Sequence, residues 1–538
     1  MHDGERVRDP AGGLPMASAR RRALVGAAGA LPGVLAWRPA RAQSGGGTMV
    51  WGVSGIFPRH FNPALQTGPA QMLIGAQLFG TPLGIDRRWR VRPGLCEAWS
   101  VSEDSRSITL RLRPGLSFHD GRPITSEDLR FSIEAVREHH PYRALFAPVN
   151  GVTLSDDRTA VIRLAEPHPA LELAMTCVFT PVLPRHVYGD GTPLPAHPRN
   201  ASNAVGSGPF RLVESKPGEH VVLERFERFH DRPRLERFIV RNYRDVASSL
   251  VAFERGEIDV VSPTDPRDIE RIRRVPGIVF DDDAGPGFGP LVWLSFNCRH
   301  PQLQDVRVRQ AISYAIDREF IVKTLFGGWH QRATGPIPPG RPFYSADVQR
   351  YDPDPAKAAA LLDAAGLRPG PNGMRASFSL DCLPGVADMR TTAEYLKPAL
   401  AKVGIDVALR VSPDFGTWAK RVSTYQFDLN VDSNWTFGDP VIGVHRAWMS
   451  SNIREGVIWT NTHRYENPRV DALLADATKE TDRTRRAALY RDFQRIVVDD
   501  APAAFLYSPR YATAYGRRVA DVQLELWYQP IVRPSMRA

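Results

Sequence analysis

A histidine stands beside an aspartate in the stretch FHDGRPITSEDLRFSIEAV, residues 118–136. Imidazole and carboxylate groups are the usual agents of acid–base catalysis and of metal binding, so His119 and Asp120 are the first candidates for chemistry. A structural interpretation accounts for the same residues, because Asp120 and Gly121 are typical of a tight turn. Thr125 and Asp128 have the spacing of a helical capping box. We therefore favour a strand-to-helix corner over a catalytic pair.

The residues after this corner have helical periodicity. Leu129, Ile133 and Val136 recur at i, i+4 and i+7, which places them on one apolar face of a helix. We therefore predict that this stretch has a structural role rather than a catalytic one.

The remaining sequence offers no established catalytic motif. It contains no GxxxxGK[ST], HExxH or GxSxG pattern, and the four cysteines form no zinc-type spacing. We predict a protein without catalytic residues, metal ligands or cofactor. An exported hydrolase is the alternative from a different functional class.

Aromatic residues concentrate between residues 415 and 459. The segment begins at Phe415 and holds four of the eleven tryptophans, together with a tyrosine and two further phenylalanines: Trp418, Trp435, Trp448, Trp459, Tyr425, Phe427 and Phe437. Such residues either fill a core or line a pocket for a small organic ligand. Trp435 and Asp439 favour the pocket interpretation, because Gly438 and Pro440 place them in a loop.

The elements that must position these residues alternate between strands and helices. Short alternating strands dominate residues 89–205, and the pairs Asp354-Pro355 and Asn467-Pro468 have the residue types that begin helices. The stretch GPGFGPLVWLSFN, residues 285–297, is predicted to be a glycine-rich loop followed by an apolar strand. This pattern indicates an α/β protein.

Length, composition and charge further restrict the class of protein to which the chain can belong. A chain of 538 residues exceeds one compact core, and 43% hydrophobic and 24% charged residues are typical of globular proteins. The formal net charge is +10, but residues 1–42 carry seven arginines against three acids. The remaining positive charge is interleaved with acids, which does not indicate a nucleic-acid partner.

Residues 1–42 resemble an export signal. Three arginines, 20–22, precede the apolar run ALVGAAGALPGVLAW, and Ala40-Arg41-Ala42 follows it. The paired arginines indicate the twin-arginine route, with cleavage after Ala42 and with Met1 or Met16 as the start. No cysteine lies near the cut, so we expect a periplasmic protein without a lipid anchor.

The pairing of the cysteines is left open by the sequence. Cys96, Cys177, Cys298 and Cys382 allow one or two disulfides in an oxidising compartment. Their largely apolar surroundings allow buried free thiols equally well.

Several motifs in order resemble the dipeptide/oligopeptide family of solute-binding proteins, the family 5 receptors of ABC importers. They are FHDGRPITSEDLRFSIEAV, GSGPFRLVESKPGEHVVLERF, FNCRHPQLQDVRVRQAISYAIDREFIV, YDPDPAKAAALLDAAG and YENPRVDALLADA. The matches run from about Gly52 to Pro509, nearly the whole chain after residue 42. One such motif is weak, but five in the right order are specific.

The resemblance implies a two-lobed periplasmic binding protein fold with hinged lobes and an additional subdomain inserted in lobe one. Lobe one is expected from residues 43–88, 206–296 and 500–538. The subdomain is expected from residues 89–205, and lobe two from 297–499.

The resemblance also implies where the ligand binds. In peptide-binding members an aspartate in a W-x-x-D-x-x-DP loop pairs with the ligand's ammonium group. Here the loop is the shorter WTFGDP, so the first aspartate is missing and only Asp439 can inherit its role. The expected ligand-binding residues are Phe61, Asn62, Trp418, Tyr425, Trp435, Thr436, Phe437, Gly438 and Asp439.

The function implied is a monomeric periplasmic receptor that delivers a small solute to inner-membrane ABC permease subunits. A peptide is the default ligand, and opines, oligosaccharides, nickel or metallophores are the alternatives within the fold. His445 and His463 keep the metal alternative open. The sequence alone does not identify the ligand.

Overall fold

The computed structural model describes residues 47–54, 57–65, 68–176, 179–284 and 286–520. All of them belong to one compact unit, Gln43–Ala538. The predicted export signal lies outside the described residues. No described helix is both long enough and apolar enough to cross a membrane.

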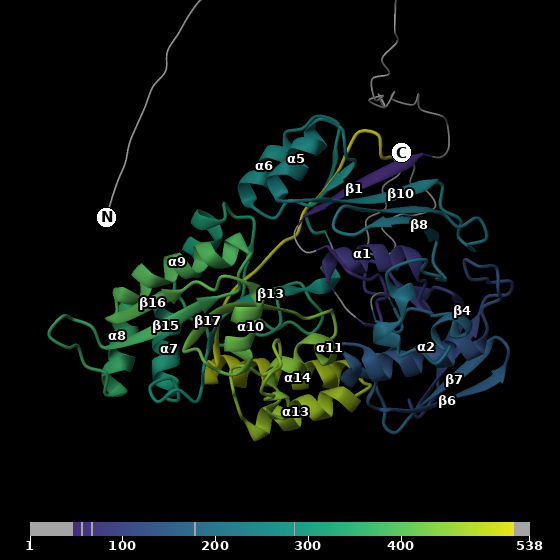
Figure 1. Cartoon of the computed structure of the whole chain (residues 1–538). Coiled ribbons are helices and arrows are strands. Elements are labelled where there is room, and N and C mark those ends of the chain that lie inside the picture. The colour runs from purple at the N-terminus through teal and green to yellow at the C-terminus, as the bar shows by residue number, and fades with distance from the viewer. Residues whose placement is uncertain (1–46, 55–56, 66–67, 177–178, 285, 521–538) are drawn as a thin grey trace, which may run out of the picture. The chain divides into compact units, whose positions relative to one another are not determined.

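One sheet contains seven strands in the order β12-β19-β11-β1-β10-β9-β8 (Figure 1). β1 runs parallel to its neighbours β10 and β11, and the other neighbouring pairs are antiparallel. The strands span Thr48–Ser54 (β1), Phe210–Lys216 (β8), His220–Arg225 (β9), Arg237–Tyr243 (β10), Val260–Val261 (β11), Val279–Asp281 (β12) and Thr513–Tyr515 (β19).

Both faces of this sheet are covered by helices. Alternate side chains of a strand point to opposite faces, so Met49 and Trp51 of β1 enter one core and Val50 enters another. α1 (Pro69–Leu78) lies on the first face. α5 (Val246–Glu254) and α6 (Pro266–Arg273) lie on the second (Figure 1).

A four-stranded antiparallel sheet, β4-β5-β7-β6, forms most of the β-rich segment. Its strands and the small β2-β3 hairpin span Cys96–Val101 (β4), Ser107–Leu112 (β5), Val149–Asp156 (β6), Thr159–Leu164 (β7), Leu83–Ile85 (β2) and Val91–Pro93 (β3). The short helices α3 and α4 span Leu171–Ala174 and Arg185–Tyr188.

Helix α2 (Ser126–His139) packs on the four-stranded sheet as the motif predicts. The Asp128 carboxylate accepts from the Thr125 backbone N–H at 2.9 Å, and the predicted capping box is confirmed. The predicted stripe of Leu129, Ile133 and Val136 is fully buried.

A third sheet contains six strands in the order β14-β18-β13-β17-β15-β16. They span Pro290–Phe296 (β13), Gln331–Arg332 (β14), Ala376–Cys382 (β15), Ile405–Arg410 (β16), Leu429–Trp435 (β17) and Ala503–Ser508 (β18). Every residue of β13 and β18 is buried, because both strands lie inside the sheet. The apolar strand predicted after the glycine-rich loop is therefore confirmed.

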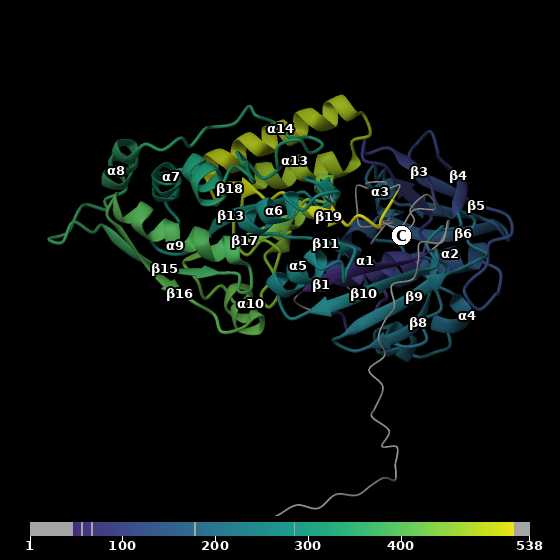
Figure 2. The same ribbon diagram turned by 90° about the horizontal axis from the view of Figure 1, so that it is seen from above.

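The helices around this sheet begin where side-chain caps predict. Asp305, Asp354 and Asn467 each accept from a backbone N–H of the first turn. The helices are α7 (Val306–Ala315), α8 (Pro355–Ala364), α9 (Ala387–Ala401), α10 (Phe415–Ser423), α11 (Pro440–Gly443), α12 (His445–Trp448), α13 (Pro468–Lys479) and α14 (Arg483–Asp500). Figure 2 shows α13 and α14 side by side. A π-helix spans Phe320–Leu325.

Sheet membership bears on the predicted division into lobes, which stays a prediction. Strands of the seven-stranded sheet come from the segments 43–88, 206–296 and 500–538. β13 and β18 also fall in those segments, yet they lie in the six-stranded sheet with β17.

The described cysteines are free thiols. Cys96, Cys298 and Cys382 form no disulfide, and Cys177 lies outside the described residues. Burial raises the pKa of Cys96 to about 12 and that of Cys298 to about 11, so both stay protonated at neutral pH.

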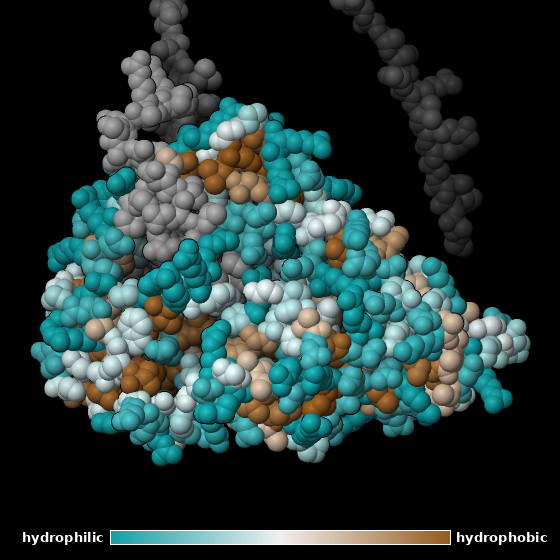
Figure 3. Space-filling view, turned by 180° about the vertical axis from the view of Figure 1, so that it is seen from behind, coloured by the Kyte–Doolittle hydropathy of each residue, from teal (hydrophilic) through white to brown (hydrophobic). Residues whose placement is uncertain are grey.

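The surface agrees with the scattered charge of the sequence. On the face shown in Figure 3, hydrophilic residues predominate and the hydrophobic patches are interrupted by them. Many arginines pair with neighbouring acids, such as Arg271 with Glu254 at 2.5 Å.

Candidate functional site

The strand-to-helix corner that contains His119 has a structural role. The His119 Nδ1 accepts from the Gly206 N–H at 3.1 Å, and its Nε2 lies 3.0 Å from the Gly208 carbonyl oxygen. Burial lowers the pKa of His119 to about 4, so the ring is neutral. A Cβ on Gly206 would lie 1.9 Å from the Leu78 carbonyl oxygen, which explains the glycine of the GSGP motif.

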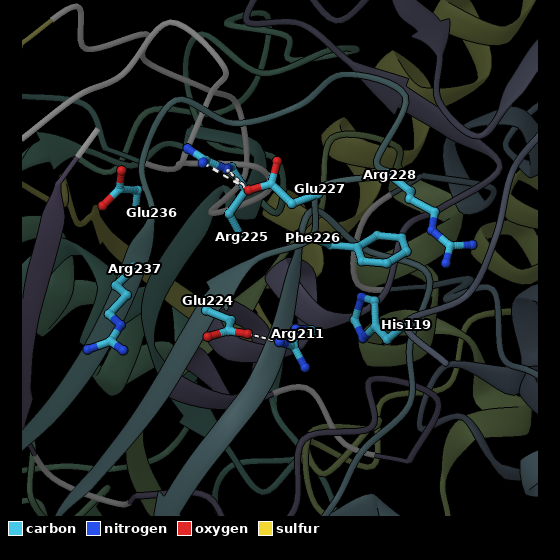
Figure 4. Close-up of a pocket in the computed structure, with 9 residues that line it drawn as sticks. All are labelled: His119, Arg211, Glu224, Arg225, Phe226, Glu227, Arg228, Glu236 and Arg237. Atoms are coloured by element: carbon cyan, nitrogen blue, oxygen red, sulfur yellow. Dashed lines mark hydrogen bonds and ion pairs between the residues drawn. The ribbon is translucent and has the colours of Figure 1, made fainter. Parts of the chain in front are cut away.

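A surface depression beside His119 is lined mainly by charged residues. Figure 4 shows that Arg211 faces Glu224 and that Arg225 faces Glu227, and these four residues form ion pairs. The depression has a volume of about 430 Å³. A lining of charges of both signs is typical of a solvated surface rather than of a solute site.

The loop that was predicted to bind the ligand follows β17 and is attached to the segment before β13. The Thr436 N–H donates to the Phe288 carbonyl oxygen at 2.9 Å, and the Thr436 hydroxyl donates to the Gly289 carbonyl oxygen at 3.0 Å. Trp435 is half-buried, and its ring centroid lies 5.2 Å from that of Phe288. The loop is therefore held by backbone contacts.

Phe437 is the centre of an aromatic cluster. Its fully buried ring lies 5.0 Å from Tyr142, 5.5 Å from Phe179, 5.8 Å from Trp435 and 6.1 Å from Phe288, between centroids. These contacts surround the ring with protein. A ligand contact of Phe437 stays a prediction.

Gly438 is required by two independent features. Its φ is +77°, which favours glycine, and a Cβ there would lie 1.7 Å from the Trp89 ring. The loop therefore turns sharply at Gly438, next to the Trp89 indole. No other residue type fits without displacing Trp89.

Asp439 has a partner within the chain. Arg486 donates from Nη1 to Oδ2 at 2.6 Å and from Nη2 to Oδ1 at 2.8 Å, and both side chains are buried. Burial alone would raise the pKa of Asp439, but Arg486 outweighs this and holds it below the usual range. Asp439 also caps α11 through the Val441 N–H at 3.1 Å. Its predicted ligand role stays a prediction, and its carboxylate is already paired.

Phe61 and Asn62 lie in the interior. Phe61 is buried, and the Asn62 side chain donates to Asn200 Oδ1 at 2.9 Å and accepts from the Ala64 N–H at 3.0 Å. The Asn62 amide therefore holds the turn in which it lies. Whether either residue contacts a ligand stays a prediction.

Trp418 and Tyr425 lie shortly before β17 in the chain. The buried Trp418 indole N–H donates to Asn430 Oδ1 at 3.1 Å. Arg464 lies over the Tyr425 ring at 4.8 Å. The predicted residues thus divide between Trp418 and Tyr425 near β17, the 435–439 loop after it, and Phe61 and Asn62 elsewhere.

The structure also shows a buried group that sequence reasoning missed. We define the Asp432 cluster as Trp293, Asn430, Asp432, Trp448 and His463. All five are at most 4% exposed. Trp293 is the register partner of Asp432 across β13 and β17, so the two side chains share a face of the sheet.

The aromatic members of the Asp432 cluster pack closely. Trp448 stacks on His463 with centroids 4.8 Å apart, and Trp293 meets Trp448 at 5.5 Å and His463 at 5.3 Å. The His463 Nδ1 lies 3.0 Å from the Ser295 hydroxyl. Burial lowers the pKa of His463 to about 3, so this histidine is neutral.

Four polar atoms of this cluster have no hydrogen-bond partner among the described residues: Trp293 Nε1, Asn430 Nδ2, Trp448 Nε1 and His463 Nε2. Buried polar groups are nearly always paired in folded proteins. A concentration of unpaired groups therefore indicates a place where another molecule completes the bonds.

Backbone strain gathers in the same region. Among the described non-glycine residues, nine have positive φ, and four of these lie just before β17, in its following loop or in the segment 459–464: Tyr425, Phe437, Trp459 and Arg464. Bulky residues rarely adopt this conformation, and such strain is concentrated at binding and active sites.

The histidines that kept a metal site open do not approach each other in a three-ligand group. Within the described ranges, no group of three or more His, Cys, Asp or Glu could hold a metal ion. His445 Nε2 lies 3.0 Å from the Tyr490 hydroxyl, and burial lowers its pKa to about 3.

One signal could have found the missed cluster. Asp432 is an acid in the otherwise uncharged strand LNVDSNW, at a position expected to be buried. The aromatic segment contained Trp448 and Trp459, but only the pairing of β13 with β17 brings Trp293 to them.

Known proteins resemble this chain over most of its length. The dipeptide-binding protein of Escherichia coli (strain K12) is 27% identical over 446 residues, which are 77% of this chain and 80% of that protein. An ABC transporter substrate-binding protein, CtaP, from Listeria monocytogenes has a solved structure with a TM-score of 0.80 at 24% identity. That match covers 92% of this chain and 99% of CtaP.

A second solved structure, NikZ from Campylobacter jejuni in complex with Ni(L-His), has a TM-score of 0.78 at 23% identity and covers 89% of this chain and 96% of NikZ. The fold of these proteins is the two-lobed periplasmic binding protein fold, which the chain was predicted to adopt. The family described as bacterial extracellular solute-binding proteins, family 5 Middle, matches residues 90–455. The chain therefore belongs to family 5 of the bacterial extracellular solute-binding proteins.

Proposed function

We propose that this chain captures a small, peptide-like solute outside the cytoplasmic membrane and passes it to the permease subunits of an ABC importer. One observation carries the proposal: within the described ranges, buried hydrogen-bonding atoms without partners gather beside β17. A receptor must keep such capacity free for its solute, whereas a merely structural core satisfies it internally.

A peptide is the default solute, because the related E. coli protein is a dipeptide-binding protein. A nickel–amino acid complex is the second candidate. NikZ binds Ni(L-His), and the His463 Nε2 in this chain has no described partner. Neutral imidazole is a common nickel ligand.

We infer that the solute is enclosed between two lobes joined at two crossings. The Ala284 N–H donates to the Tyr511 carbonyl oxygen at 2.8 Å, and the Ser508 hydroxyl donates to the Pro290 carbonyl oxygen at 2.7 Å. These bonds support two crossings that run side by side, near residues 284–290 and 508–513. The subdomain 89–205 belongs to lobe one in this proposal.

Export through the twin-arginine route is part of the same proposal. A variant with Arg20→Lys, Arg21→Lys and Arg22→Lys keeps the charge of the signal and removes the arginines that the route recognises. We expect the variant to stay in the cytoplasm, as fractionation and immunoblotting would show. Unchanged export would assign the signal to the general route.

The proposed function is tested by mass spectrometry of the protein after release from the periplasm. Native spectra should show an added mass of a few hundred daltons in stoichiometric amount, lost on denaturation. Absence of any bound solute, also after incubation with a bacterial metabolite extract, would contradict the proposal. Chemical conversion of a bound solute would instead identify a hydrolase.

A further inference from the structure

Another pocket lies between helix α6 and the segment 324–329. Its volume is about 690 Å³, a size typical of small-molecule sites. Its described lining contains five arginines against two acids, and none of the residues predicted to bind the solute belongs to it. The charged lining residues are Arg267, Glu270, Arg271, Arg273, Arg274, Asp282 and Arg510. The pocket therefore has an excess of three positive charges.

The wall of this pocket is built from three distant parts of the chain. Ile269 of α6, Trp329 and Ala512 form a small buried core cluster. The Trp329 indole N–H donates to the Arg510 carbonyl oxygen at 2.9 Å. Phe280 of β12 packs against the same cluster, and its ring centroid lies 6.2 Å from that of Trp329. These contacts fix the pocket before any ligand enters, which lowers the cost of binding.

Arg273 is held at the pocket by two aromatic rings. Its guanidinium carbon lies 5.0 Å from the ring centroid of Phe280 and 5.3 Å from that of Trp329. Its nitrogens lie 3.5 Å from Glu270 and 3.9 Å from Asp282. Both distances exceed the roughly 2.7–2.9 Å of a charge-assisted hydrogen bond. The rings thus position a guanidinium whose charge is only weakly compensated.

Two other arginines of the pocket pair with acids that do not line it. Arg267 lies 2.9 Å from the Asp265 carboxylate, and Arg271 lies 2.5 Å from that of Glu254. Both pairs are exposed to solvent, so their net contribution to stability is small. Arg267 and Arg271 therefore add to the positive potential of the pocket without being its main ligand contacts.

Arg274 and Arg510 have no such partner. Both are exposed, and in the described part of the chain neither forms an ion pair. The depression beside His119 is different, because its four arginines stand against three glutamates. Only the pocket at α6 combines a clear excess of arginine with guanidinium groups that are not engaged by acids.

We propose that this pocket binds a small polyanion, a molecule with two or more phosphate or carboxylate groups, through Arg273, Arg274 and Arg510. Guanidinium groups bind such oxygens with paired N–H bonds, and arginine is the residue best suited to this geometry. An anion with a single charge would leave the other guanidinium groups unpaired. The hollow shape favours a free small molecule over a membrane surface. The inference does not depend on the proposed receptor function.

The first test is isothermal titration calorimetry of the full-length protein with pyrophosphate and with citrate, at constant ionic strength set with sodium chloride. We expect one-to-one binding of at least one of these probes, about tenfold or more tighter than binding of acetate, which carries one charge. Failure of both probes to bind would overturn the proposal.

The variant arm compares two double substitutions that remove the same charge. Arg274→Gln with Arg510→Gln should weaken binding of the probe about tenfold or more. Arg228→Gln with Arg237→Gln is the matched control, because these arginines are also exposed and line the depression beside His119. We expect the control to change the affinity by less than about twofold. Equal weakening by both would show a general attraction by the net charge and overturn the site.

A third arm needs no variant. Phenylglyoxal labels accessible guanidinium groups, and mass spectrometry of peptides locates the labels. Pyrophosphate should slow the labelling of Arg274 and Arg510 and leave that of Arg228 and Arg237 unchanged. Equal labelling with and without pyrophosphate would overturn the proposal even if a variant does not fold. Binding to phosphatidylglycerol vesicles through Arg274 and Arg510, without binding of the soluble probes, would overturn the small-molecule occupant in favour of a membrane.

Discussion

Two buried carboxylates lie seven residues apart, one within β17 and one just after it. Asp439 is held by both terminal guanidinium nitrogens of Arg486, Nη1 and Nη2, and its pKa lies below the usual range. In the described part of the chain no cation pairs with Asp432, and burial raises its pKa to about 7. A buried carboxylate with an internal cation has its charge compensated, so loss of the cation is costly, whereas a buried carboxylate without a cation reduces stability.

The largest effect should follow from removing the partner of Asp439. Arg486→Leu leaves a buried carboxylate unpaired, so we expect the free energy of unfolding to fall by about 3–5 kcal/mol. Urea unfolding at pH 7 measures it. The control is Arg485→Leu, whose side chain is 70% exposed and whose ion pair with Glu480 is worth less than about 1 kcal/mol. Equal losses in the two variants would refute the structural role of the Asp439–Arg486 pair.

Asp432→Asn should instead raise the free energy of unfolding at neutral and alkaline pH. The unfolded carboxyl ionises near pH 3.8 and the folded one near 7, so between these values the folded protein holds an extra proton. The free energy of unfolding therefore decreases as pH rises through this window and is constant above it. Asn removes this term, which amounts to about 4 kcal/mol at pH 8.

Thermal unfolding of both proteins at pH 4 and pH 8 checks this prediction. The groups that face Asp432 do not obscure it, because Trp293, Trp448 and Trp459 do not titrate and His463 is neutral throughout. At pH 4 the two proteins should unfold at nearly the same temperature. A variant that is less stable at pH 8 would show that Asp432 is a structural acid.

The loop between the two carboxylates allows a sharper test of rigidity. Gly438→Ala introduces both a strained φ and a clash with Trp89, so we expect a loss of about 2–4 kcal/mol. Gly115→Ala is matched, because its φ is +71° and nothing lies within 4 Å of the added Cβ. Chemical unfolding should show the larger loss at Gly438, and equal losses would mean that Trp89 yields freely.

The smallest expected change in stability is that of Trp459→Phe, a substitution next to Asp432. Trp459→Phe keeps the ring and removes the indole N–H, which favours the ionised carboxylate. The pKa of Asp432 should rise, and the stability lost with increasing pH should grow by about 0.5–1 kcal/mol. Unfolding measured from pH 4 to pH 9 reports this change. An unaltered profile would exclude the indole as a partner of Asp432.

Local features could be predicted from the sequence, and long-range ones could not. The capping box at Thr125 and the caps at Asp305 and Asn467 depend on residues within one turn, so their spacing was sufficient. The sheet that contains β13 and β18 depends on pairing with distant strands. For this reason the segment boundaries alone did not place these two strands.

The candidate site shows the same limit. Asp439 was chosen because it lies in a loop, but its partner Arg486 is forty-seven residues further along. The importance of Asp432 depends on Trp293, which is far earlier in the chain and reaches it only across two strands. Loop position is visible in a sequence, whereas the absence of a partner is visible only in a fold.

The exposed indole of Trp459 has a consequence for selectivity. It is among the groups that lower the pKa of Asp432, so a ligand that reached this carboxylate would exchange one interaction for another rather than add one. A neutral donor would exchange a bond of about 0.5–1.5 kcal/mol for a similar one and gain almost nothing, while a charged donor would reach about 1.5–3 kcal/mol. The indole would thus favour charged ligands at Asp432 without any steric barrier.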